Sequence, residues 1–255
     1  MSYIISVHSF RGGTGKSNST ANIASILTRG GGGRRVCIID TDIQSPGVHV
    51  LFGMDEHDMN YTLNDYLWGK CAIDEATYDV TNRLGDDVPD GGQLFLCPSS
   101  IKAGEIARVL REGYDVGLLN DGFHDLIDSL NLDVLLIDTH PGINEETLLS
   151  IAISDALAII MRPDNQDFQG TSVTVEVARK LDVPRMTLVV NKVPSVFDIE
   201  DLRATIGKTY DCKVAGVIPH SDEMMALSSS DLFTLKFPDH IVTKEYYRIA
   251  EALMS

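Results

Sequence analysis

The chain has 255 residues, of which 44% are hydrophobic and 23% charged, and its 37 acidic against 21 basic residues give a formal net charge of −16. This composition is ordinary for a globular protein and excludes disorder as the main state. The acidic balance opposes a broad nucleic-acid surface, because phosphate binding requires clustered lysine and arginine.

Short apolar runs rich in β-branched residues alternate along the chain with segments of helical spacing. In chain order, strands are expected at 3–9, 35–40, 94–97, 132–138, 156–161, 186–191 and 214–218. Helices are expected between them, including 16–28, 103–110, 123–130, 170–181 and 244–254. Buried strands that alternate with helices indicate an α/β fold with a mostly parallel, twisted sheet covered by helices on both faces.

No repeat or convincing boundary divides the chain, so we expect one domain spanning residues 1–255. The segment 55–92 is the least regular, and its stretch 85–92 is rich in Gly, Asp and Pro, which predicts an exposed loop. The last segment, 243–255, carries apolar residues at helical spacing, which predicts a helix that faces the core rather than a membrane. Those residues are Tyr246, Ile249, Ala250 and Leu253.

The sequence shows no export or membrane signal. The longest apolar runs, such as 156–161, are far shorter than the about 20 residues that a spanning helix needs. The N-terminus has no basic region or cleavage site, so we expect a cytoplasmic protein. The cysteines are scattered without a C-x-x-C pair, which predicts buried free thiols rather than a zinc ribbon. They are Cys37, Cys71, Cys97 and Cys212.

The first expected strand runs into the glycine-rich segment 9–17, Ser-Phe-Arg-Gly-Gly-Thr-Gly-Lys-Ser, and a helix follows. Such a turn lets backbone N–H groups converge on an anion, and the helix N-terminus adds its positive end. We expect Lys16 to reach the β- and γ-phosphates of a nucleotide and Ser17 to ligate Mg²⁺. The ordinary phosphate loop has glycine where this chain has Phe10, so the motif deviates at one position. The residues expected to contact the nucleotide are Gly12, Gly13, Thr14, Gly15, Lys16, Ser17 and Asn18.

The form [K/R]-G-G-x-G-K-[ST] resembles the deviant Walker A loop of the MinD/ParA family of P-loop ATPases, and the resemblance extends from Ser2 to about Met254. Members of that family usually carry lysine where this chain has Arg11. In the family that lysine reaches the partner's phosphates across a nucleotide-bridged dimer. The resemblance implies this catalytic role for Arg11, since arginine keeps the charge and binds phosphate bidentately. The alternative is that Arg11 is a solvated loop cation.

Two expected strands end in aspartate, at the edge where α/β sheets bind ligands. The first continues as Asp40-Thr-Asp42 before a Pro-Gly turn and resembles the family's switch I region, which implies that Asp42 positions or activates the attacking water. Asp40 is then expected to orient the metal shell and the loop. The second strand ends in Asp138, which resembles a Walker B residue that holds Mg²⁺ through water. Where the family usually has proline, this chain has His140, which we expect to be a neutral hydrogen-bonding residue near the γ-phosphate rather than a base.

The residues at the ends of two later expected strands resemble the segments that bind the adenine base in the same family. The resemblance implies that Asn191 hydrogen-bonds adenine, whose N6/N7 edge suits an amide. It also implies that Pro219 packs on the adenine. Both residues are also common in loops, and their position after the two phosphate motifs is what favours the binding role.

The resemblance implies an ATP- and Mg²⁺-binding switch that hydrolyses ATP slowly, dimerises on ATP and positions or partitions a cellular cargo. A protein cargo or adaptor is the expected partner. Non-specific DNA is the second expected partner, which a patch of Arg203, Lys208 and Lys213 would bind. A membrane is the least expected partner.

Three alternatives stay open. The first is an ATP-dependent metallocentre-maturation or carrier protein, although the chain lacks closely paired cysteines. The second is a small-molecule ligase on the same scaffold. The third is a non-catalytic ATP-binding partner module, which the departures at Arg11 and His140 favour.

Overall fold

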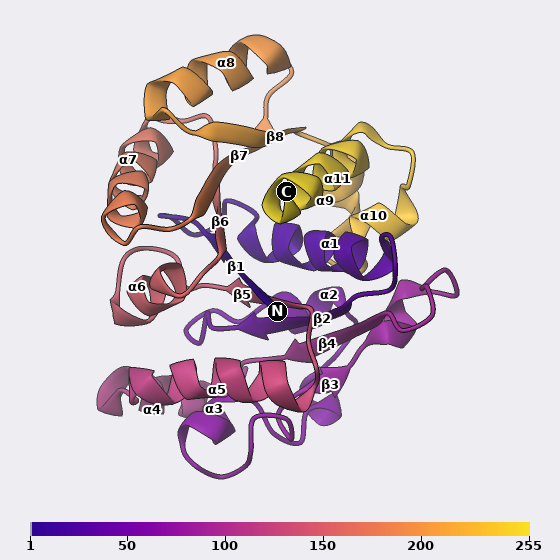
Figure 1. Cartoon of the computed structure of the whole chain (residues 1–255), viewed down its shortest axis with the longest axis vertical. Helices are drawn as coiled ribbons and strands as arrows, with labels where there is room; N and C mark the ends of the chain where they lie inside the picture. Colours follow the sequence, from indigo (N-terminus) through magenta and orange to yellow (C-terminus); the bar gives the residue numbers. More distant parts are fainter. Residues whose placement is uncertain (1) are drawn as a thin grey trace.

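The computed structural model describes residues 2–255, and at its centre lies an eight-stranded sheet in the order β3-β4-β2-β5-β1-β6-β7-β8 (Figure 1). The strands are β1 (Tyr3–His8), β2 (Arg35–Asp40), β3 (Tyr78–Asp79), β4 (Gln93–Cys97), β5 (Val134–Asp138), β6 (Ala156–Met161), β7 (Arg185–Val193) and β8 (Lys213–Pro219). In this described part, only the short β3 pairs antiparallel. The prediction of a mostly parallel α/β sheet is therefore confirmed, and β3 is the strand that it missed.

The connections between strands are mainly helical. The α-helices are α1 (Lys16–Arg29), α2 (Val48–Leu51), α3 (Leu63–Leu67), α4 (Ala103–Glu112), α5 (Val116–Ser129), α6 (Glu145–Ala152), α7 (Asn165–Lys180), α8 (Ile199–Tyr210), α9 (Asp222–Leu227), α10 (Phe233–Lys236) and α11 (Ile241–Met254). Each of the predicted helices falls within or overlaps one of these. The helices α6 and α8, and the short helices α2, α3, α9 and α10, were not among the predicted ranges.

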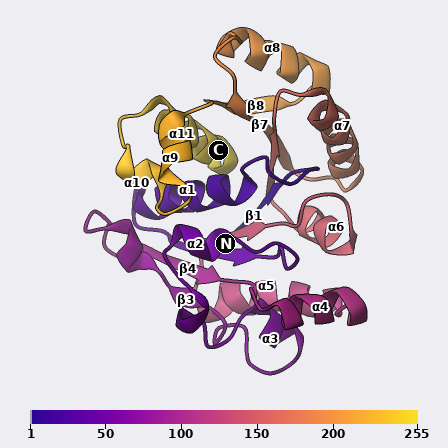
Figure 2. The same cartoon turned by 180° about the vertical axis from the view of Figure 1, so that it is seen from behind.

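Helices cover both faces of the sheet, as Figures 1 and 2 show from opposite sides. Successive strand residues point to opposite faces, so Ile5 packs in a core shared with α1 and α11, whereas Ile4 packs in a core shared with α5. A third core joins β6, β7 and β8 to α7 and α8. Because both faces are covered, strands such as β5 are buried along their whole length, which is why they read as unbroken apolar runs.

The segment 55–92 is more ordered than predicted, because Leu63 and Leu67 of α3 are buried in the core beside α5. Its stretch 85–92 has neither helix nor strand and is mostly exposed, as predicted. In the described part of the chain all four cysteines are free. Cys71 and Cys212 are only half-buried, so the prediction of burial was wrong for these two.

The C-terminal helix α11 packs on the core, as its apolar spacing predicted. Tyr246, Ile249, Ala250 and Leu253 are all buried. Within residues 2–255, no helix combines the length and the apolar character that crossing a bilayer requires.

A buried carboxylate fastens α11 to the edge of the sheet. Glu245 Oε2 accepts hydrogen bonds from the backbone N–H of Val217 (2.9 Å) and from Arg203 Nη2 (3.1 Å), and Oε1 accepts one from Arg248 Nη1 (2.6 Å). Arg203 is therefore committed to the interior contact with Glu245, which weakens the predicted DNA-binding patch that included it.

We expect Glu245→Ala to lower the free energy of unfolding by about 3–5 kcal/mol, because it leaves the Arg203 guanidinium and the Val217 N–H without their acceptor. Urea denaturation followed by circular dichroism measures the change. Glu251→Ala, at an exposed position of the same helix, is the control and should shift stability by less than about 0.5 kcal/mol. Equal denaturation midpoints for the two variants would contradict the expectation.

Candidate nucleotide-binding site

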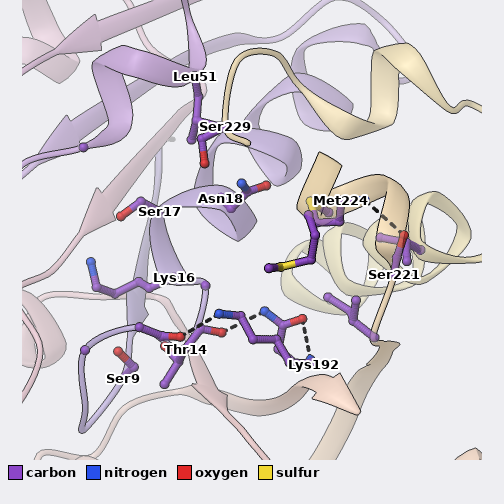
Figure 3. Close-up of a pocket in the computed structure, with 18 of the residues that line it drawn as sticks. Ser9, Thr14, Lys16, Ser17, Asn18, Leu51, Lys192, Ser221, Met224 and Ser229 are labelled. Atoms are coloured by element: carbon purple, nitrogen blue, oxygen red, sulfur yellow. Dashed lines mark hydrogen bonds between the residues drawn. The ribbon is translucent and has the colours of Figure 1, made fainter. Parts of the chain in front are cut away.

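The carboxyl ends of the central strands surround a cavity of about 720 Å³. The order of strands reverses at β1, which lies between β5 and β6, and such reversals open a crevice at the sheet edge. Figure 3 shows Lys16 and Ser17 on one side of the cavity and Ser221 and Met224 of the α9 region on the other. The lining includes the predicted glycine-rich loop, Asp42, Asn191 and Pro219.

The glycine-rich loop adopts backbone conformations that favour glycine. Gly13 has φ 76° and Gly15 has φ 95°, both in the left-handed region, and Gly15 is the N-cap residue of α1. The N-terminus of α1 therefore begins directly at the loop, where its unpaired N–H groups are available to an anion.

Two side chains near the end of β7 hold this loop by hydrogen bonds to its backbone. Asn191 Nδ2 donates to the Thr14 carbonyl (2.8 Å) and Lys192 Nζ donates to the Gly13 carbonyl (2.9 Å) (Figure 3). The sequence analysis missed Lys192. Nothing in the local sequence pattern links it to Gly13, because the two residues lie far apart in the chain.

We expect Gly15→Ala to weaken Mg-ATP binding by at least about tenfold, because a Cβ there would overlap Asn191 Nδ2 and a left-handed residue other than glycine costs roughly 1–3 kcal/mol. Titration calorimetry measures the affinity, and a thermal melt checks the fold. Gly31→Ala is the control, since its Cβ meets nothing within 4 Å and its backbone is not left-handed. The expectation fails if both variants bind with equal affinity.

Lys16 lies at the floor of the cavity among carboxylates. Its side chain is 6% exposed, and Nζ lies 3.1 Å from Asp138 Oδ2 and 3.7 Å from Asp42 Oδ2. Burial alone would lower the pKa of Lys16, but the carboxylates of Asp138, Asp42 and Asp40 outweigh it and raise the pKa above the usual value. Within residues 2–255, Nζ has no partner of hydrogen-bond geometry. A buried ammonium whose N–H groups lack such a partner favours a ligand that brings hydrogen-bond acceptors, such as phosphate oxygens.

Asp138, at the end of β5, is held by two hydroxyl groups of α1. Ser17 Oγ donates to Oδ2 (2.7 Å) and Thr20 Oγ1 donates to Oδ1 (2.7 Å). The carboxylate therefore lies beside the hydroxyl that was predicted to ligate Mg²⁺. Thr20 was not predicted, although its position one helical turn after Lys16 is a signal for it.

Asp40 pairs in register with Asp138 on the neighbouring strand and is fully buried. Burial, and then the charge of Asp138, raise the pKa of Asp40 well above its usual range. Its carboxylate accepts the backbone N–H groups of Asp42 (3.1 Å), Gly47 (3.1 Å) and Val48 (3.3 Å). This arrangement shapes the loop after β2, which is one of the two roles expected for Asp40.

The oxygen donors of this site suit Mg²⁺ bound together with a nucleotide. Within the described chain, no group of three or more His, Cys, Asp or Glu residues is placed to hold a metal ion by itself. Mg²⁺ typically takes one or two protein ligands and completes its shell with phosphate oxygens and water. The side-by-side Ser17 hydroxyl and Asp138 carboxylate fit that pattern, and the metal roles of Ser17, Asp40 and Asp138 stay predictions.

Asp42 has a partner that the sequence did not predict. His140 Nδ1 lies 2.7 Å from Asp42 Oδ1, with 18% and 10% of the two side chains exposed. His140 is thus a hydrogen-bonding residue at the edge of the site. The pair joins loops that follow β2 and β5, and only the adjacency of these strands brings the two residues together.

Arg11 does not point freely into solvent. Its Nη1 lies 3.6 Å from Asp167 Oδ1 and 3.8 Å from Asp164 Oδ1, both at the start of α7. The neighbouring Phe10 packs on Gly170 of the same helix, where a Cβ would overlap the Phe10 ring. The loop is therefore docked on α7, and a contact between Arg11 and a phosphate of a second molecule stays a prediction.

The two residues predicted to bind the base, Asn191 and Pro219, line the same cavity as Lys16. Asn191 is buried, and its Oδ1 accepts the Lys192 N–H (2.8 Å) while one Nδ2 hydrogen goes to Thr14. An adenine contact by Asn191 would therefore use its second amide hydrogen. Met224 also lines the cavity and was not predicted.

This chain is similar to known nucleotide-binding proteins. The family model described as the CobQ/CobB/MinD/ParA nucleotide binding domain matches residues 5–235. An uncharacterised ATP-binding protein of Methanocaldococcus jannaschii is 26% identical over 255 residues, which cover 100% of this chain and 88% of that one. An iron-sulfur cluster carrier protein of Methanococcus maripaludis is 28% identical over 192 residues, covering 74% of this chain and 60% of that one.

Solved structures share the fold over the whole chain. The cell division ATPase MinD of Pyrococcus furiosus superposes with a TM-score of 0.80 at 21% identity, covering 100% of this chain and 99% of that one. The septum site-determining protein MinD of Pyrococcus horikoshii, solved with Mg-ADP, gives a TM-score of 0.77 at 20% identity, covering 98% and 95%. At these identities the likeness concerns the fold.

Proposed function

This chain belongs to the CobQ/CobB/MinD/ParA nucleotide-binding family, and we propose that it is an ATP-driven switch that binds Mg-ATP, dimerises while ATP is bound and hydrolyses it slowly. The observation that carries the proposal is the buried Lys16 ammonium at the head of α1, beside the paired Ser17 and Asp138 side chains. The phosphates of a triphosphate would bind to the N-terminus of α1 and to the Lys16 ammonium, and Mg²⁺ would offset the charge of the carboxylates nearby. Mg²⁺, held by Ser17 and by Asp138 through water, would neutralise charge on the phosphates.

Hydrolysis needs little more than positioning and charge stabilisation in such a site. A water oxygen bonds to the γ-phosphorus while the bond from that phosphorus to the β,γ-bridging oxygen breaks. ADP leaves with that electron pair, the water becomes the hydroxyl of inorganic phosphate, and one proton passes to solvent. Lys16 stabilises the charge that develops on the phosphates, and Asp42 accepts a hydrogen bond from the water and orients it.

The switch acts through partners. We propose that ATP bridges two copies of the chain, that Arg11 leaves Asp167 and Asp164 to contact the phosphates of the second copy, and that the dimer binds a protein cargo or adaptor in the cytoplasm. The net charge of −16 and the engagement of Arg203 with Glu245 favour a protein partner over DNA.

A carrier of metal clusters is the second candidate, because one relative bears the name iron-sulfur cluster carrier protein. Among the cysteines of residues 2–255, Cys71 and Cys212 are the two that are partly exposed, and neither lines the nucleotide cavity. Metal analysis of protein purified without oxygen distinguishes the carrier from the switch. Iron in stoichiometric amount would favour the carrier. A module that binds ATP without hydrolysing it would show Mg-ATP binding and no phosphate release.

The test of the switch combines titration calorimetry, phosphate release and light scattering on the full chain. We expect heat from Mg-ATP binding, slow phosphate release, and a doubling of mass with ATP that is absent with ADP. A correctly folded protein that gives no heat with Mg-ATP would overturn the whole proposal. Binding without a mass change would overturn the dimerisation alone.

A further inference from the structure

The contact between His140 and Asp42 is held rigidly from both sides. The turn that carries His140 is bonded to the end of β1, because Thr139 N–H donates to the Val7 carbonyl (3.2 Å) and Gly142 N–H donates to the Ser9 carbonyl (3.1 Å). His140 lies between these two anchors, so its backbone is held by the sheet rather than by a free loop.

The turn that carries Asp42 is fixed in the same way. Thr41 N–H donates to the Asp138 carbonyl (2.9 Å), and Asp42 N–H donates to Asp40 Oδ1 (3.1 Å). A carboxylate only accepts hydrogen bonds, so the 2.7 Å contact requires His140 Nδ1 to carry the shared hydrogen. This donation occurs in the neutral and in the protonated ring.

The Asp42 carboxylate has two side-chain neighbours, the Lys16 ammonium and the His140 imidazole. Binding of a nucleotide would move Lys16 away from Asp42. Lys16 Nζ lies 3.7 Å from Asp42 Oδ2, opposite the histidine on Oδ1. When phosphates enter the loop, the Lys16 ammonium is drawn to them. His140 then remains as the side-chain donor to Asp42, while Oδ2 is released toward the cavity.

We propose that His140 is a positioning residue, which holds Asp42 by Oδ1 so that Oδ2 faces the attacking water once Lys16 has moved to the phosphates. The inference rests on the proposed function, and it adds a residue that acts on the reaction only through Asp42. The role requires a side chain that donates a hydrogen bond at this position, which alanine and proline cannot do.

The test compares side chains that donate from different positions. The amide Nδ2 of asparagine occupies the place of histidine Nδ1 along the side chain, whereas the Nε2 of glutamine occupies that of histidine Nε2. Wild type, His140→Ala, His140→Asn and His140→Gln are compared by single-turnover phosphate release, with protein in excess over ATP. Calorimetry gives the Mg-ATP affinity of each, and thermal melts confirm the fold.

We expect His140→Ala and His140→Gln to slow phosphate release by about 10- to 100-fold with unchanged Mg-ATP affinity, and His140→Asn to keep most of the rate. In an Asp42→Asn background, His140→Ala should cause no further loss. If His140→Ala fails to fold, the contrast between the asparagine and glutamine variants carries the test.

A wild-type rate in His140→Ala, equal rates in the asparagine and glutamine variants, or a further loss in the double variant would each overturn the positioning role and leave the proposed function intact. A wild-type protein that binds Mg-ATP without releasing phosphate would instead overturn the proposed hydrolysis, and the positioning role with it.

Discussion

Replacing Lys16 with alanine is expected to weaken Mg-ATP binding by at least about 100-fold and to abolish measurable hydrolysis, since removing one member of a buried charge cluster costs roughly 2–5 kcal/mol of binding energy. Lys16 is the cation at the floor of the cavity, 3.1 Å from Asp138 Oδ2. Its loss leaves the phosphates facing Asp138 and Asp42 with no protein charge between them. Titration calorimetry and phosphate release measure the two effects.

The same substitution also acts on stability, because it leaves carboxylates buried without their counter-charge. A thermal melt is therefore part of the experiment, and Lys16→Met, which keeps most of the side-chain volume, separates loss of charge from loss of packing. Lys180→Ala is the control, since this lysine is largely exposed on α7 and, within residues 2–255, forms an ion pair only with Glu176. A folded Lys16→Met protein that binds Mg-ATP as tightly as Lys180→Ala would refute the role given to Lys16.

Asp42→Asn is expected to separate binding from hydrolysis. Asparagine is nearly isosteric and still accepts a hydrogen bond from His140, so the loop after β2 should keep its shape and Mg-ATP should bind as it does to wild type. Its neutral amide orients the attacking water poorly, and we expect single-turnover phosphate release to fall by roughly 100-fold. The ATP-bound dimer should accumulate in light scattering, because it is no longer consumed.

Asp211→Asn is the matched control, because Asp211 is fully exposed at the end of α8 and asparagine suits its left-handed backbone. It should hydrolyse ATP at the wild-type rate. Should Asp42→Asn release phosphate as fast as Asp211→Asn, another group must orient the water. Both the catalytic role of Asp42 and the positioning role of His140 would then have to be abandoned.

The sequence predicted the parts of the fold that local pattern determines. β2 and β6 have the bounds predicted for them, because strands covered on both faces are continuous apolar runs bounded by polar residues. The short β3 and α9 were missed, since a few residues carry no periodicity and take their form from the elements they pack on.

Some features of the candidate site could likewise be predicted from local sequence, and others could not. The glycine turn and the strand-end aspartates are local signals in the sequence, and the structure brings Lys16, Asp42 and Asp138 together. The contacts of Arg11 with Asp167 and of Asp42 with His140 join residues about a hundred or more positions apart. Such pairs depend on strand order and helix docking, which the alternation of elements does not specify.

The bracing of the glycine turn by Asn191 and Lys192 has a thermodynamic consequence. Because the carbonyls of Thr14 and Gly13 are already tied to β7, the entropy of ordering this turn is lost when the sheet forms rather than when a ligand arrives. The cradle is therefore preorganised, and its local opening is coupled to that of the inner strand β7. Amide hydrogen exchange in the turn should therefore be slow without nucleotide, at rates set by the sheet and not by a mobile loop.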